Sequence, residues 1–175
     1  MKLSTRQQQY LASLAKAPHV SILFVCLGNI CRSPAAEGVM RELTEADGIA
    51  QHFTLDSAGI GSWHIGQLPD KRMRVHAQRR GLTLDHLCRQ VKEADFDRFD
   101  IIIGMDAENI ADLRALAPTP EAEAKIFPMA AFVNMAMRYD YIPDPYYEGA
   151  EGFELVLDLL ENGCRRLADT LRKAS

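Results

Sequence analysis

The chain has 175 residues, 47% of them hydrophobic and 25% charged, which is typical of one globular domain with a buried core. Its formal net charge of -4, with acidic and basic residues mixed along the chain, argues against a broad nucleic-acid-binding face and leaves room for one local anion site. The sequence has no apolar run near the roughly 18 residues that cross a bilayer, no secretory pattern, and four cysteines without metal-ligand spacing. We therefore expect a cytoplasmic protein with free thiols, no membrane association and no nucleic-acid partner.

Hydrophobic spacing predicts helices and strands that alternate along the chain. A weak amphipathic pattern over 3–16 predicts a helix within an N-terminal extension, 1–18, and the apolar run 20–25 is typical of a strand buried on both faces. Ser33 and Pro34 then open a helix, with the serine capping free amides and the proline at the first helical position. The remaining predicted elements, in chain order, are strand 53–58, helix 70–80, strand 99–104, helix 106–115, strand 124–127 and helix 151–171.

This alternation predicts an α/β fold, with a single domain over 19–175 following the extension. The expected architecture is an open sheet of about four parallel strands flanked by helices on both faces. Ligands of such sheets bind at the carboxyl ends of strands near the point where strand order reverses, and the turn after the first strand is the usual place. We therefore expect the functional site in the turn that follows 20–25.

That turn holds a cysteine and an arginine separated by five residues, Cys26 and Arg32. Five residues can wrap a tetrahedral oxyanion, so that successive amides and the helix N-terminus point at one phosphate. Gly28 relieves crowding and Asn29 tolerates a left-handed bend, while the planar guanidinium of Arg32 binds two phosphate oxygens. The predicted phosphate-binding loop consists of Leu27, Gly28, Asn29, Ile30, Cys31 and Arg32.

The same residues predict a cysteine nucleophile. The positive field of the loop favours the thiolate of Cys26, which can attack phosphorus without a metal or cofactor, and Ser33 is placed to donate a hydrogen bond to that thiolate. A leaving phenolate also needs a proton, and Asp144, followed by Pro145 in a polar loop, is the candidate general acid. The expected reaction is hydrolysis of a phosphate monoester with inorganic phosphate as product.

Two segments, 25–34 and 144–147, resemble low-molecular-weight protein tyrosine phosphatases. The resemblance covers about 20–171 and includes further matches in the family's order, which are Asp56-Ser57-Ala58-Gly59, Trp63-His64, His86 through Arg89-Gln90, Phe99-Asp100, and Met105-Asp106 with Asn109. It implies a phosphatase of phosphotyrosine-containing proteins with a cysteinyl-phosphate intermediate. In that reaction Cys26 is the nucleophile, Arg32 clamps the phosphate, and Asp144 acts as acid and then as base toward water.

The resemblance also implies residues that spacing does not reveal. Asn29, Ser57 and His86 would form a hydrogen-bond network that braces the loop, although unaided we would take Ser57 for a strand-end residue and His86 for a surface histidine. Asp106 looks like a helix N-cap and gains a supporting role only by resemblance. Cys31 would trap the oxidised nucleophile as a reversible disulfide, or else simply be buried under the loop.

For the substrate pocket, the resemblance suggests walls that select a long aryl phosphate over phosphoserine. These wall residues are Ile30, Trp63, His64, Tyr146 and Tyr147.

Other activities on the same loop stay open. Arsenate reductases need additional paired cysteines, whereas only Cys88 and Cys164 remain, both of which we assign to packing. Related arginine phosphatases typically carry a threonine in place of Ile30. A phosphocysteine carrier or phosphate-binding module would not need the acid Asp144. The sequence leaves the physiological substrate, the oligomeric state and the role of 1–18 open.

Overall fold

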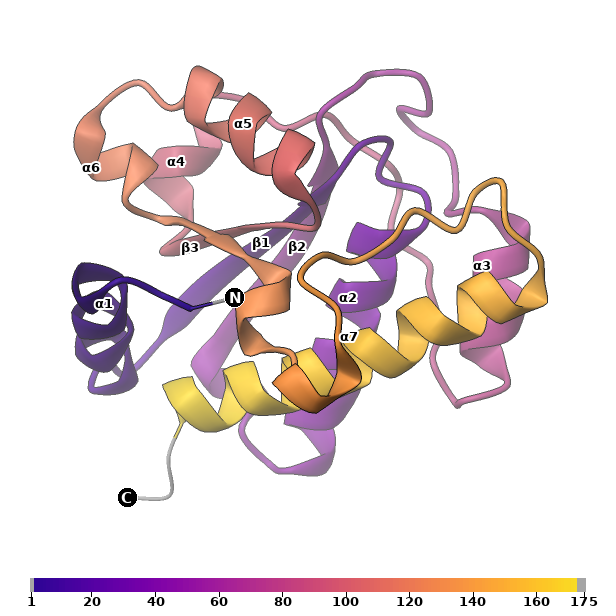
Figure 1. Ribbon diagram of the computed structural model, residues 1–175, viewed down its shortest axis with the longest axis horizontal. Coiled ribbons are helices and arrows are strands. Elements are labelled where there is room, and N and C mark those ends of the chain that lie inside the picture. The colour runs from indigo at the N-terminus through magenta and orange to yellow at the C-terminus, as the bar shows by residue number, and fades with distance from the viewer. Residues whose placement is uncertain (1, 173–175) are drawn as a thin grey trace.

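A computed structural model, which describes residues 2–172, contains a four-stranded parallel sheet with the strand order β2-β1-β3-β4 (Figure 1). The strands are β1 Val20–Cys26, β2 Phe53–Gly59, β3 Ile101–Gly104 and β4 Ile126–Pro128. After β1 the chain adds β2 on one side and then returns to add β3 on the other. Strand order therefore reverses at β1, and the predicted loop lies directly at this switch point.

Helices cover both faces of the sheet, which confirms the predicted α/β fold. Ile22 and Phe24 of β1 face one core together with α1, α2 and α7, while Leu23 and Val25 face the other, with α4, α5 and α6 (Figure 1). This alternation follows from the two-residue period of a strand. The helices are α1 Thr5–Ala15, α2 Arg32–Ala46, α3 Lys71–Gln78, α4 Asp95–Arg98, α5 Ala107–Leu116, α6 Pro120–Glu123 and α7 Ala150–Leu171, with 3₁₀ turns η1 Ala50–His52, η2 Met129–Phe132 and η3 Met135–Met137.

The N-terminal helix α1 packs on the rest of the chain. Ser4 and Gln7 form a reciprocal capping box at its start, and Leu11 and Leu14 enter the core shared with α7. The hydroxyl of Tyr10 donates to the backbone oxygen of residue 100 at 2.7 Å, just before β3. The predicted helix in the extension is thus present, and it is tied to the sheet.

The start of α2 differs from the prediction. The helix begins at Arg32 with Cys31 at the N-cap position and no side-chain cap, so Pro34 is the third helical residue rather than the first. Ser33 therefore does not cap the helix, because its hydroxyl is directed at other partners in the site. The physical consequence is that the first amides of α2 stay available to the phosphate-binding loop.

Two short helices and several strand limits also differ from the prediction, with β1, β2 and β4 each ending one residue later than expected. The sequence pattern gave no sign of α4 or α6, because one turn is too short to show a helical period. The first residue of each predicted strand, Phe99 or Ala124, is instead the C-cap of the preceding helix, and β3 begins at Ile101 and β4 at Ile126.

Candidate active site

The predicted loop runs from the last residue of β1 to the first of α2. The Sγ atom of Cys26 lies 3.1 Å from the Oγ atom of Ser33, so the hydroxyl can donate to a thiolate. Asn29 has a φ of 59°, the left-handed bend for which asparagine is suited. The turn thus brings the cysteine, the serine and the helix N-terminus together.

Asn29 is the centre of a buried hydrogen-bond network. Its Nδ2 donates to Ser33 Oγ at 2.8 Å and to Ser57 Oγ at 3.0 Å, while its Oδ1 accepts from the backbone amide of Arg89 at 3.0 Å. Nε2 of His86 lies 3.0 Å from the same Oδ1, and because this oxygen can only accept, the ring nitrogen is the donor. The structure therefore joins the loop to β2 and to the segment that precedes α4.

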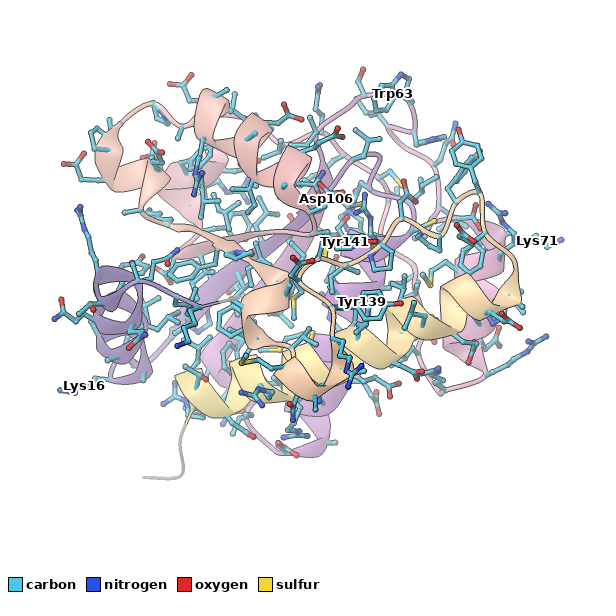
Figure 2. The ribbon with its side chains drawn as sticks, in the orientation of Figure 1. Lys16, Trp63, Lys71, Asp106, Tyr139 and Tyr141 are labelled. Carbon is cyan, nitrogen blue, oxygen red and sulfur yellow. The ribbon has the colours of Figure 1, made fainter. Side chains whose placement is uncertain are left out.

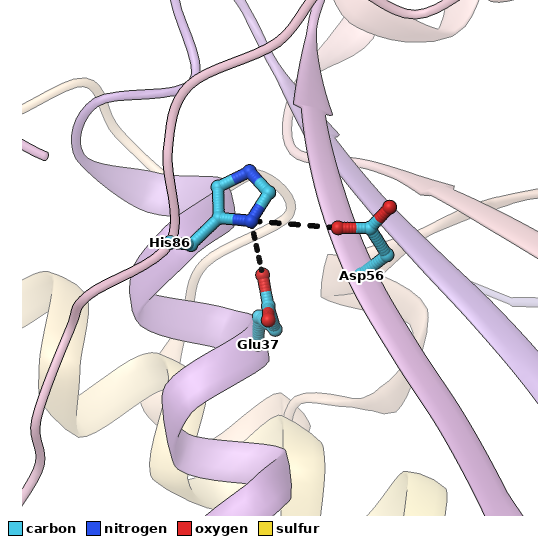
Figure 3. A group of neighbouring side chains, drawn as sticks. All are labelled: Glu37, Asp56 and His86. Atoms are coloured by element: carbon cyan, nitrogen blue, oxygen red, sulfur yellow. Dashed lines mark ion pairs between the residues drawn. The ribbon is translucent and has the colours of Figure 1, made fainter. Parts of the chain in front are cut away.

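Two carboxylates and His86 form a second layer beneath the loop (Figure 3). Ser57 Oγ donates to Glu37 Oε1 at 2.7 Å, and His86 Nδ1 lies 3.5 Å from Glu37 and 3.4 Å from Asp56. These three side chains offer ligand atoms within 4.8 Å of one another, as a cation site would. However, Ser57 also donates its amide to Asp56, and Arg41 donates to Glu37, so the chain's own donors already engage both carboxylates.

The side chain of Arg32 is buried and held from two directions. Its Nη1 atom donates to Asp106 Oδ2 at 2.6 Å and to the backbone oxygen of Ile142 at 2.9 Å. Burial opposes the charge, but negative charge at Cys26, together with Asp106 and Asp144, raises the pKa of Arg32. Asp106 also caps α5, as the sequence predicted, so one carboxylate both starts that helix and orients the guanidinium.

Asp144 lies on the loop that leads into α7. Its Oδ1 accepts the amide of Tyr146 at 3.0 Å, and its Oδ2 lies 3.8 Å from Arg32 Nη2. The carboxylate is 42% exposed, so it stands at the mouth of the site and not under the loop. The local turn thus points a carboxylate at the site that the loop forms.

A cavity of about 300 Å³ connects these groups. All five predicted wall residues contribute to it, and His64 packs against the loop at Gly28. Cys26, Leu27, Gly28, Ile30, Cys31, Arg32, Trp63, His64, Asp144, Tyr146 and Tyr147 line this cavity.

Several contacts at the site were not predicted. The thiol of Cys88 donates to the backbone oxygen of Asn29 at 2.8 Å, so this cysteine contacts the loop in addition to packing. Arg89 binds the fully buried Asp95 with two hydrogen bonds of 3.0 Å each. Arg72 lies over the ring of Tyr146, with 5.2 Å between its guanidinium carbon and the ring centre. The Arg-Gln match at 89–90 was the one hint of the Arg89 contact, and nothing in the spacing indicated the others.

Selective alkylation of one thiol is expected from the surroundings of the four cysteines, all of which are free. Burial and then Asp70 raise the pKa of Cys31, burial and then Cys26 raise that of Cys88 to about 11, and burial raises that of Cys164. These three remain thiols near neutral pH, whereas Cys26 lines the open cavity together with the guanidinium of Arg32, to which an anionic reagent binds. Iodoacetate should therefore label Cys26 first, and inorganic phosphate should slow the reaction, as measured by peptide mass spectrometry.

Labelling of Cys88 should appear only as the pH rises toward about 11, because a raised pKa keeps the thiol protonated below that value. Equal labelling of all four cysteines near neutral pH would contradict this assignment.

Comparison with known proteins gives matches over most of the chain. Residues 21–175 match the family model described as low molecular weight phosphotyrosine protein phosphatase. A low molecular weight protein-tyrosine-phosphatase of Bacillus subtilis is 44% identical over 155 residues, which are 88% of this chain and 97% of that relative. Helix α1 precedes the matched region.

Solved structures share the fold. A protein tyrosine phosphatase from Entamoeba histolytica superposes with a TM-score of 0.84 at 42% identity, covering 87% of this chain and 96% of that chain. A Drosophila arginine phosphatase superposes with a TM-score of 0.81 at 32% identity, covering 88% and 99% respectively. Of the helices between residues 2 and 172, none combines the length and apolarity needed to cross a bilayer.

Proposed function

The chain belongs to the low molecular weight phosphotyrosine protein phosphatase family and is a protein-tyrosine-phosphatase, and from this premise we propose how its own residues perform the hydrolysis. The proposal rests on one observation, which is that Cys26, Arg32 and Asp144 line the same cavity at the carboxyl end of β1. A nucleophile, a cation and an acid around one cavity are the groups that phosphoryl transfer needs.

In the first step the Cys26 thiolate attacks phosphorus, a sulfur–phosphorus bond forms, and the bond from phosphorus to the tyrosine oxygen breaks. The loop amides and Arg32 stabilise the negative charge on the phosphoryl oxygens. The proton of Asp144 passes to the departing phenolate, so the product leaves as neutral tyrosine.

In the second step water attacks the cysteinyl-phosphate. Asp144 takes the proton from the water, the sulfur–phosphorus bond breaks, and inorganic phosphate is released. Ser33 donates its hydrogen bond to the returning thiolate and lowers the cost of its departure. The side chains of Asn29, Ser57, His86 and Asp106 hold the loop and Arg32 in this geometry without touching the reacting atoms.

The substrates are proposed to be phosphotyrosine-containing proteins. Ile30 and the aromatic residues Trp63, Tyr146 and Tyr147 give the cavity an apolar wall that suits an aryl group. The four free thiols support a reducing compartment, for which cytoplasm is our proposal. Cys31 is proposed as the redox partner of Cys26, since both thiols line the same cavity.

Substrate choice can be tested with three matched peptides carrying phosphotyrosine, phosphoserine or phosphoarginine, with chelator present. We expect kcat/KM for the phosphotyrosine peptide to exceed kcat/KM for the phosphoserine and phosphoarginine peptides by on the order of 10²-fold or more. The reason is that only phosphotyrosine has an aryl group that can pack against the walls of the pocket. Initial rates of phosphate release measure the preference.

The phosphoarginine peptide is included because a Drosophila arginine phosphatase has a similar fold. Faster turnover of phosphoarginine would overturn the substrate proposal. Release of inorganic phosphate over many turnovers would indicate hydrolysis, whereas a phosphocysteine carrier would take up one equivalent of the phosphoryl group on sulfur and release none to water. Arsenate-dependent oxidation of Cys88 would instead favour a reductase.

A further inference from the structure

The indole of Trp63 rests directly on the backbone of Gly61. A Cβ atom added at Gly61 would lie 1.9 Å from Cζ3, 2.2 Å from Cε3 and 2.5 Å from Cη2 of the indole. Distances this short cannot occur between real atoms, so any side chain at Gly61 would displace the ring. The backbone of Gly61 is not in the left-handed region, and alanine would therefore fit its conformation without strain.

Gly61 is fixed relative to the phosphate-binding loop. Its amide donates to the backbone oxygen of Leu27 at 2.8 Å, and the amide of Ile60 donates to that of Cys26 at 2.9 Å. Farther along, the amide of Gly66 donates to the backbone oxygen of Cys88 at 2.8 Å. The backbone on both sides of Trp63 is thus tied down, which leaves the ring as the part that must yield to a new side chain.

Trp63 stands at the edge of the molecule, on the loop that follows β2 (Figure 2). Its side chain lines the catalytic cavity while the residue remains 65% exposed. An exposed ring has few neighbours to hold it, so the contact with the bare Cα of Gly61 is a large part of what positions the indole.

From these contacts we infer that Gly61 is a specificity-determining residue of the phosphatase. By leaving room for the indole, it sets the position of the wall against which the aryl group of the substrate packs, while the loop that binds phosphate is unaffected. The inference rests on the proposed function, in which Trp63 lines the substrate pocket. Gly61 itself touches none of the reacting atoms and acts only through Trp63.

Gly61→Ala tests this inference. We expect KM for aryl phosphates to rise by about 2- to 10-fold, the size of a typical aromatic packing contact, with kcat nearly unchanged. Inhibition by inorganic phosphate and turnover of a small alkyl phosphate should stay as in the parent, because neither reaches the displaced wall. Ser62→Ala is the matched control, since Ser62 is exposed on the same loop.

Fluorescence supplies a readout independent of activity, because Trp63 is the single tryptophan of the chain. Gly61→Ala should change the emission of the indole and its quenching by acrylamide, while Ser62→Ala should not. Circular dichroism verifies that each variant is folded.

The double variant Gly61→Ala/Trp63→Ala decides whether the effect passes through the indole. Compared with Trp63→Ala alone, the double variant should have the same KM, because the added alanine then has no indole to displace. A double variant whose KM is higher than that of Trp63→Ala alone, or a Gly61→Ala variant with altered emission and parental KM, would overturn the inference. Neither outcome bears on Cys26 or on the choice among phosphopeptides, so failure here is distinct from failure of the proposed function.

Discussion

Cys26→Ser is expected to lower kcat for a phosphotyrosine peptide by on the order of 10⁴-fold or more, as removal of a nucleophile does in other covalent enzymes. A serine hydroxyl stays protonated at neutral pH, and the neighbouring Ser33 offers it no base. The loop amides and Arg32 remain, so binding of inorganic phosphate should survive. Phosphate release measures the first effect, and isothermal calorimetry with inorganic phosphate measures the second.

Cys164→Ala is the matched cysteine control, because Cys164 is fully buried on α7, outside the catalytic cavity, and its thiol donates a long hydrogen bond of 3.7 Å to the backbone oxygen of Ala36. It should lower stability modestly by leaving a small cavity and keep kcat. Normal turnover by Cys26→Ser would overturn the covalent mechanism. Loss of phosphate binding together with activity would instead indicate a collapsed loop, which the calorimetry distinguishes.

Asp144→Ala is expected to lower kcat/KM for phosphotyrosine peptides by about 10²- to 10⁴-fold, the usual contribution of a general acid. The effect should depend on the leaving group. A nitrophenyl phosphate, whose phenolate leaves without a proton, should lose far less than an alkyl-substituted phenyl phosphate. Plotting log kcat/KM against the pKa of the leaving phenol for both enzymes measures the change in slope.

Asp140→Asn controls for charge, since Asp140 is an exposed carboxylate in the same stretch of chain before α7. It should leave both the rate and the slope unchanged. If the Asp144→Ala enzyme kept the parental rates with poor leaving groups, Asp144 would not be the general acid. That result would favour another acid, and the proposed mechanism would need revision.

The main elements of the fold could be predicted because their signals are local. The apolar run of β1 and the stripe of α7 each reflect which face of one element is buried. The single-turn helices α4 and α6 escaped prediction because four residues are too few to show a period. The alternation of helices and strands indicates a parallel sheet but does not give the order of its strands. The structure shows that this order reverses at β1.

The active site divides in the same way. Cys26 and Arg32 share one short segment, so their spacing alone indicates an oxyanion site after a strand. Asp144 gains meaning only when the fold brings it to the same cavity. The family resemblance identified Ser57 and His86, but no pattern within the chain indicates that both hydrogen-bond to Asn29.

The sequence by itself determined the alternation of helices and strands, and it placed Cys26 and Arg32 in the turn after the first strand, on which the proposed phosphate-binding loop and cysteine nucleophile rest. Only the tertiary structure decided that Glu37 lies buried beneath Ser57, that the Cys88 thiol contacts Asn29, and that the Trp63 indole rests on Gly61. The reason is physical. Periodicity records which side of an element avoids water, whereas a hydrogen bond or a ring contact depends on direction and distance between backbones that folding brings together.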